Sequence, residues 1–226
     1  MRVKTTEFII ISLILFSFII GIYLYPLMPE RMVSHWNIKG EVDDYLSKFW
    51  GVFLIPLISI GLFLLYLIIP QIDPLKENIK KFRKYFDGFF ILLFLFLFYV
   101  YLLTIFWNFG LKFNIGQAMM PALAILFYYC GVLLEKAKRN WFIGIKTPWT
   151  LSSDKVWDKT HQLGGRLFKI TGLIVLLGAF FKEYILWFVL VPIIITAIYT
   201  IAYSYFEYQK VGKSKKFREI QNKNNG

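Results

Sequence analysis

Long runs of hydrophobic residues dominate the chain and alternate with shorter polar segments. A helix needs roughly 20 apolar residues to cross about 30 Å of hydrocarbon. Runs that approach this length cover residues 8–25, 50–70, 89–107, 117–134, 167–181 and 184–206. The pattern predicts an all-α integral membrane protein with about six transmembrane helices. The fifth run is the shortest and carries Lys169 near one end.

The polar segments do not suggest separate domains. We interpret residues 1–226 as a single polytopic membrane domain. Its polar parts are a loop at 26–49, a segment at 135–166 and a basic tail at 207–226. Hydrophobic residues make up 58% of the chain, above the roughly 45–50% of soluble domains. The single cysteine, Cys130, excludes a disulfide framework within one chain.

The distribution of basic residues predicts which side of the membrane each segment faces. The net charge is +12. With six helices, 21 Lys and Arg residues fall on one face and 5 on the other. Because Lys and Arg are enriched in cytoplasmic segments, we predict cytoplasmic termini in a multi-pass cell-membrane protein. The 26–49 loop would then be extracytoplasmic and 135–166 cytoplasmic. The basic excess indicates topology and contact with membrane lipid, not a nucleic-acid partner.

The extracytoplasmic loop has the composition of an ordered structure. Gly40 can supply a positive φ and Asn37 favours a turn, while Trp36 suits the membrane interface. An imidazole and an indole side by side could contact a secreted peptide or a lipid. The contact candidates in this loop are therefore His35, Trp36 and Asn37. An interfacial anchor is the alternative interpretation.

The polar segment 135–166, called the signature segment below, contains local breaks and a helix start. Gly144 interrupts regular structure. Ser153 is a suitable N-cap for a helix that runs to Leu163 and ends at Gly164 and the following glycine.

Three side chains of this helix are of types that can bind metal ions, and their helical spacing predicts that they share one face: Asp154, Asp158 and His161. A rise of about 1.5 Å per residue separates the first from the last by roughly 10 Å, so the three cannot easily hold one ion. The sequence also has no His-Glu-x-x-His motif and no cysteine pair. We therefore predict no metal site and no cofactor. A solvated helix face with local hydrogen bonds is the simpler interpretation.

Standard catalytic motifs do not occur in the sequence. It contains no Gly-x-Ser-x-Gly, phosphate-binding or dinucleotide-binding pattern, so we name no catalytic residue. Ion-coupled transporters usually place ionisable groups deep in their helices, and the centres of these apolar runs have none. Both observations disfavour an enzyme and an ion-coupled transporter.

Two polar segments carry a more specific pattern. The first comprises Asn140, Gly144, Ile145, Thr147, Trp149, Thr150, Leu151, Ser153, Val156, Trp157, Thr160, His161 and Gly164. The second comprises Met28, Pro29, His35, Trp36, Asn37, Gly40, Asp43, Tyr45, Ser47 and Lys48. Together they resemble the SdpI family of bacterial and archaeal membrane proteins, including the N-terminal domain of unknown function common in that family. The resemblance implies immunity to a secreted antimicrobial peptide and participation in signal transduction.

Two positions depart from the family pattern. Lys146 stands where the family commonly has Arg, and Val33 where the loop commonly has a second proline. Arg offers a planar fork and Lys a point charge, so a bidentate contact at position 146 would be altered. The resemblance carries no catalytic residue over to this chain.

The main functional hypothesis is a non-enzymatic protein for immunity to, or signalling in response to, a secreted antimicrobial peptide. Its inner contact candidates, facing a cytoplasmic regulator, are Lys146, Thr147, Trp149, Trp157, Asp158 and His161. The alternative is a small transporter or metal-dependent lipid-modifying enzyme that uses the Asp and His of the inner loop. A third interpretation is an assembly factor that recruits a cytoplasmic protein.

Overall fold

A computed structural model gives the architecture of residues 5–37 and 39–224, with side chains described as far as residue 212. The predicted cytoplasmic charges of Arg2 and Lys4 lie outside the described residues. So do the side chains at the end of the basic tail.

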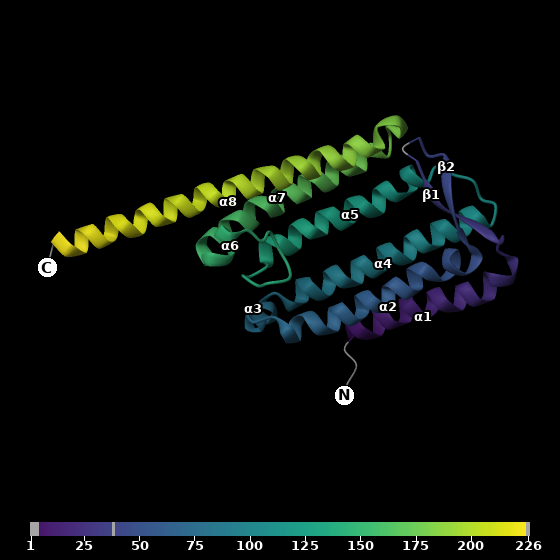
Figure 1. Ribbon diagram of the computed structural model, residues 1–226, viewed down its shortest axis with the longest axis horizontal. Coiled ribbons are helices and arrows are strands. Elements are labelled where there is room, and N and C mark those ends of the chain that lie inside the picture. The colour runs from purple at the N-terminus through teal and green to yellow at the C-terminus, as the bar shows by residue number, and fades with distance from the viewer. Residues whose placement is uncertain (1–4, 38, 225–226) are drawn as a thin grey trace.

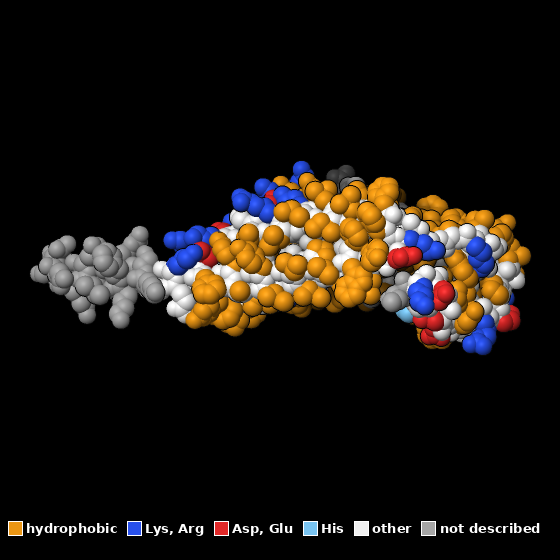
Figure 2. Space-filling model, turned by 90° about the horizontal axis from the view of Figure 1, so that it is seen from above, with side chains coloured by type: hydrophobic (Ala, Val, Ile, Leu, Met, Phe, Trp, Pro, Cys, Tyr) orange, Lys and Arg blue, Asp and Glu red, His pale blue; other side chains and the backbone are white. Residues whose placement is uncertain are grey.

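Most of the described chain forms long helices (Figure 1). Those long and apolar enough to cross a membrane are α1 (Thr5–Leu24), α2 (Lys48–Ile72), α4 (Arg83–Asn108), α5 (Ile115–Lys136) and α8 (Ile185–Asn224). Hydrophobic side chains cover the middle of the molecular surface in Figure 2, as expected where a protein faces lipid. The protein is therefore a multi-pass membrane protein.

The fifth predicted run, 167–181, lies in α7 (Asp154–Gly178) as far as Gly178, and α7 is not among the five helices selected by length and apolar character. The first half of α7 is polar, so the helix is not apolar enough to be counted among the candidate membrane spans. It nevertheless packs along α5 and α8 and returns the chain to the opposite end of the bundle (Figure 1).

The predicted end of this helix at Gly164 is wrong, because α7 continues without a break to Gly178. The glycines permit close helix packing instead. A Cβ on Gly165 would lie 2.7 Å from the carbonyl oxygen of Gly131 on α5. The same backbone approach recurs at Gly172, where a Cβ would lie 2.7 Å from a carbonyl oxygen of α5. Small residues at such contacts are typical of membrane helices.

The 26–49 loop contains a β-hairpin, an exception to the all-α prediction. After the 3₁₀ turn η1 (Tyr25–Leu27), strand β1 (Arg31–Trp36) pairs antiparallel with β2 (Val42–Ser47). Asn37 accepts a backbone hydrogen bond from Gly40, whose φ of 79° fits the turn. Turn-forming residues between two strand-length segments explain the local structure.

Shorter elements connect the helices. At the end of the bundle away from the hairpin lie α3 (Lys76–Lys81) and α6 (Pro148–Ser152), and η2 (Lys182–Tyr184) precedes α8 at the hairpin end (Figure 1).

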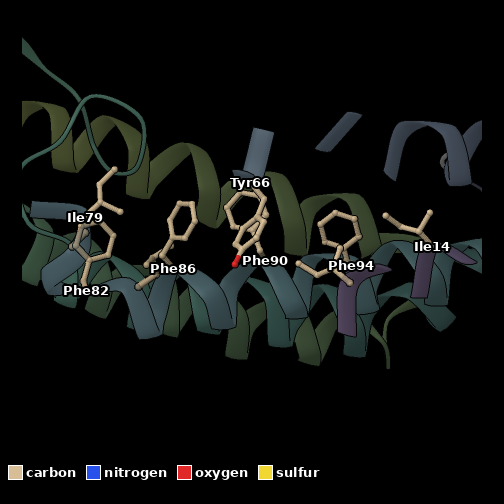
Figure 3. Packing of buried hydrophobic residues seen from close by; sticks show 10 residues of the cluster. Ile14, Tyr66, Ile79, Phe82, Phe86, Phe90 and Phe94 are labelled. Atoms are coloured by element: carbon tan, nitrogen blue, oxygen red, sulfur yellow. The ribbon is translucent and has the colours of Figure 1, made fainter. Parts of the chain in front are cut away.

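An aromatic ladder on α4 forms the centre of the first group of helices (Figure 3). Phe86, Phe90 and Phe94 recur every four residues, so they share one helix face. Tyr66 of α2 packs on the first two, with ring centroids 5.8 and 5.1 Å away. Helices α1, α2 and α4 thus form one group, which meets the group of α5, α7 and α8 along α4 and α5.

Candidate functional site

A cavity of about 840 Å³ lies beneath the hairpin, between the two groups of helices. The starts of α2, α5 and α8 and the end of α4 form its walls. Its apolar lining includes Leu54, Ile55, Met119, Met120 and Val189. Such a volume lies within the roughly 300–1,000 Å³ of typical ligand pockets. We call it the outer cavity.

All three contact candidates of the hairpin line the outer cavity. The Nδ1 atom of His35 lies 2.6 Å from a carboxylate oxygen of Asp43, and both side chains are exposed. Asn37 donates a hydrogen bond to Glu41 within the turn. The ring of Trp36 meets Trp107 edge to face, with centroids 5.4 Å apart.

The indole nitrogen of Trp36 differs from the side-chain atoms of His35 and Asn37 in its lack of a hydrogen-bond partner within the described part of the chain. It is buried and has no hydrogen-bond partner among the described residues. A buried donor without an acceptor costs free energy, so this group is well placed to bond an acceptor brought by a ligand.

At the opposite end of the molecule, Asn140 organises the start of the signature segment. Its side chain is fully buried. The amide nitrogen donates to the carbonyl oxygens of Lys138 and Ile143, both at 2.8 Å. The amide oxygen accepts the backbone N–H groups of Phe142 and Ile143. One side chain therefore replaces the hydrogen bonds that regular structure would supply here.

His161 and Trp157 form a buried stack beneath this turn, with ring centroids 3.9 Å apart. The indole N–H donates to the carbonyl oxygen of Ala137. His161 accepts the N–H of Ile145 at Nε2, so its Nδ1 carries the proton that is donated to the Trp157 carbonyl. Burial lowers the pKa of His161 to about 4, although that carbonyl and Asp158 favour the charged form. The imidazole is neutral at physiological pH.

Gly144 lets the turn pass directly over this stack. Its φ is 129°, a conformation that side chains rarely adopt. A Cβ there would meet Nε2 of His161 at 2.4 Å and the ring of Trp157 at 3.0 Å. Glycine is required here by both backbone conformation and space.

The signature segment is tied to α8 by three contacts. The hydroxyls of Thr147 and Ser204 lie 3.1 Å apart. The rings of Trp149 and Tyr205 meet edge to face at 5.2 Å.

The third contact is an ion pair between Lys159 and Glu207, 2.6 Å apart. The hydrogen bond to Glu207 raises the pKa of Lys159. The N-terminal half of α7 is thus joined to α8 at Glu207, the residue where the basic tail begins.

Two residues that the sequence did not point to join the signature segment to the first group of helices. Asp73, buried after α2, accepts the backbone N–H of Trp141 at 2.9 Å. Asn78 of α3 donates to the carbonyl oxygen of Arg139 at 2.8 Å. Asp73 is a polar residue between two apolar runs, but nothing in the sequence indicates its partner.

The inner contact candidates divide into interior and surface residues. Thr147, Trp157 and His161 are buried and hold the segment together, so their side chains present no contact surface in this conformation. Trp149 is half-buried against α8. Lys146 is exposed, and its ammonium group donates to backbone carbonyls of the preceding turn.

The prediction that Asp154, Asp158 and His161 share one solvated face is wrong. The two carboxylates are exposed and pair with Arg139 and Lys138, whereas the imidazole points into the fold. Among the side chains of residues 5–37 and 39–212, no three His, Cys, Asp or Glu are grouped to hold a metal ion.

Comparison with known proteins finds similarity in both polar regions. Residues 136–204 match the SdpI/YfhL protein family, and residues 12–60 match a domain of unknown function, DUF1648. The immunity protein SdpI of Bacillus subtilis (strain 168) is 26% identical over 209 residues. The alignment covers 91% of this chain and 98% of that protein. No solved structure matches the chain.

Proposed function

We propose that this chain, which matches the SdpI/YfhL family over residues 136–204, is a non-enzymatic membrane protein that protects its cell from a secreted antimicrobial peptide. The observation that carries the proposal is the similarity to an immunity protein along almost the whole of both chains. The similarity includes both the hairpin and the signature segment, which lie at opposite ends of the bundle (Figure 1).

The proposed topology has six passes, with α7 as the fifth and both termini in the cytoplasm. The excess of Lys and Arg in the segments at the end away from the hairpin supports this orientation. The hairpin is then extracytoplasmic and meets the secreted peptide. The whole chain acts as one membrane domain, with the basic tail at the anionic inner leaflet.

The proposed signalling role belongs to the signature segment. Its contacts with α8 and with the connection after α2 give it a mechanical link to both groups of helices. A shift between the groups would therefore change the surface that this segment presents. Lys146, Trp149 and Asp158 remain partly or fully accessible there and are the proposed contacts of a cytoplasmic regulator.

The geometry does not favour the metal-dependent enzyme. Both ring nitrogens of His161 are engaged with protein groups, so an ion could bind only after one of these bonds broke. Asp158 is paired with Lys138 at the surface, away from the buried imidazole.

Expression of the protein in a peptide-sensitive strain tests the proposal. Survival is measured against a panel of purified secreted peptides, with membrane abundance as a check on expression. Protection should require Trp36, because this residue lies in the hairpin and lines the outer cavity. Trp36→Ala is therefore compared with Trp141→Ala, which removes an exposed indole from the signature segment. If neither the wild type nor any variant protects the cells against any peptide of the panel, the immunity role is rejected.

A further inference from the structure

The outer cavity has the arrangement of a binding site for an amphiphilic chain that enters from the hairpin face. Polar groups of the hairpin, of the start of α5 and of η2 line one part of it, whereas its floor is apolar. From Asn114 to Met120 it follows α5 over six residues, about 9 Å of helix rise.

The geometry points to an apolar segment of a peptide as the occupant of the outer cavity. This inference rests on the proposed immunity function and deepens it, because it places the recognised peptide between the two groups of helices and not only on the hairpin surface.

The first argument is the mixture of polar groups along the lining. Trp36 offers a buried N–H without a partner among the described residues, and Asn114 presents an amide. Asp43 adds an acceptor, while Lys39 and Lys182 add positive charge. A peptide backbone has both N–H and C=O groups and can use both kinds of partner. An anionic lipid headgroup would use the donors but meet the Asp43 carboxylate unfavourably.

The second argument is the floor. Met119 and Met120 lie side by side in sequence and both line the cavity, together with Leu54 and Val189. Methionine side chains are flexible and polarisable, so they adapt to apolar side chains of different shapes. Such a floor can adapt to the irregular side chains of a peptide. A uniform acyl chain does not require this adaptability.

Two leucines of α8 provide a matched test. Leu186 lines the outer cavity and Leu190, one turn further, does not. Both side chains are 39% exposed, so tryptophan can be introduced at either position with similar disturbance of the fold. Leu186→Trp fills the cavity, and Leu190→Trp is the control.

Binding is measured with the full chain in nanodiscs of phosphatidylethanolamine and phosphatidylglycerol. The probe is a synthetic octapeptide of leucine, phenylalanine and glycine with a fluorophore at its C-terminus. Filling the cavity should weaken binding by about tenfold or more, since overpacked sites reject added volume, and the control should bind as the wild type does. Equal binding by the two variants, or no binding by the wild type, would overturn the inference.

Trp36→Phe provides a second measurement that does not depend on filling the cavity. It removes the unpartnered N–H and keeps an aromatic ring against Trp107. The affinity for the octapeptide should fall about threefold to tenfold, the effect of one lost hydrogen bond. An unchanged affinity would contradict the role of this donor.

A lipid arm distinguishes the other source of an apolar chain. Fluorescent phosphatidylglycerol is titrated into the same nanodiscs with and without the octapeptide. If the lipid displaces the peptide and its own binding depends on position 186, the cavity is a lipid site and the inference fails.

Cell survival separates failure of the inference from failure of the proposed function. Equal protection by the wild type, Leu186→Trp and Leu190→Trp would preserve the immunity role and overturn the role of the cavity. Protection lost only in Leu186→Trp would support both. An unprotected wild-type strain would reject the immunity role, and the nanodisc measurement would then decide the cavity alone.

Discussion

The two polar ends of the molecule are built in opposite ways. At the signature end, most buried polar side chains are hydrogen-bonded: Asn140 makes four hydrogen bonds and His161 uses both ring nitrogens, whereas the buried hydroxyl of Thr160 has no partner among the described residues. At the hairpin end, His35 and its partner are exposed, and the buried N–H of Trp36 has no partner among the described residues.

This difference separates a structural role from a binding role. A satisfied buried network holds one arrangement of the chain, because each removed partner leaves another group unpaired. Exposed polar groups around an apolar cavity can be replaced at little cost to the fold and are free to meet a ligand. We expect substitutions at the signature end to change stability first, and substitutions at the hairpin end to change recognition first.

The largest expected effect is at Gly144. In Gly144→Ala the new methyl group would need a strained backbone and would overlap His161, so the free energy of unfolding should fall by about 2–5 kcal/mol. The control is Gly110→Ala, near the hairpin end, where φ is 114° but an added Cβ would meet no described atom within 4 Å. Thermal unfolding in detergent measures both. Equal losses would mean that backbone strain alone matters and the buried stack does not.

The next effect is the pH dependence that His161 imposes. Its pKa falls from 6.5 to about 4 on folding, so below pH 6.5 the unfolded chain binds a proton that the folded chain does not. The stabilising contribution is complete above pH 6.5 and is lost as the pH falls toward 4. The loss should reach about 3 kcal/mol by linkage.

Unfolding between pH 7 and 4 measures this effect, with His161→Gln as the comparison. The variant should be less stable at pH 7 but should lack this part of the pH dependence. Parallel pH profiles for the two proteins would show that the imidazole is not the titrating group.

A smaller effect is expected from removing one indole of the stack. Trp157→Phe loses the hydrogen bond to Ala137 and leaves a buried carbonyl oxygen unpaired, so it should cost about 2 kcal/mol. Trp141→Phe, in the same segment but 51% exposed, should change stability by less than about 0.5 kcal/mol. Chemical denaturation of the pair measures the difference. A similar cost for both would show that the signature segment is not a packed unit.

The smallest effect on stability is expected at His35. Its contact with Asp43 is exposed, so His35→Gln should change the free energy of unfolding by less than about 0.5 kcal/mol. Its position on the outer cavity nevertheless predicts weaker protection against the secreted peptide. Survival and thermal unfolding are measured on the same variant. Normal protection, or a large loss of stability, would remove the contrast between the two ends.

The sequence predicted the membrane class and the two polar segments, because apolar runs of spanning length and clusters of polar residues are local properties of the chain. It also predicted Ser153 as a helix cap and the positive φ of Gly40, and the structure confirms both. The sequence did not predict the hairpin strands. It also placed the helix end wrongly at Gly164, because glycine reads locally as a helix terminator.

Side-chain direction and partner choice could not be derived in the same way. Helical spacing put His161 with Asp158, yet packing under Gly144 turned the imidazole inward and left the carboxylate at the surface. Asp73 lies 68 residues from the backbone N–H that it accepts. Such pairings depend on how distant helices meet, and hydrophobic periodicity carries no information about that.

The sequence by itself determined that the chain enters the membrane, where its polar segments occur and which family pattern they carry. These follow from the free energy of transferring side chains to lipid and from residue types at fixed spacing. Only the tertiary structure decided that the signature segment is a buried region held by hydrogen bonds, whereas the hairpin borders a cavity. That distinction arises where two groups of helices pack closely at one end and leave space beneath the hairpin at the other.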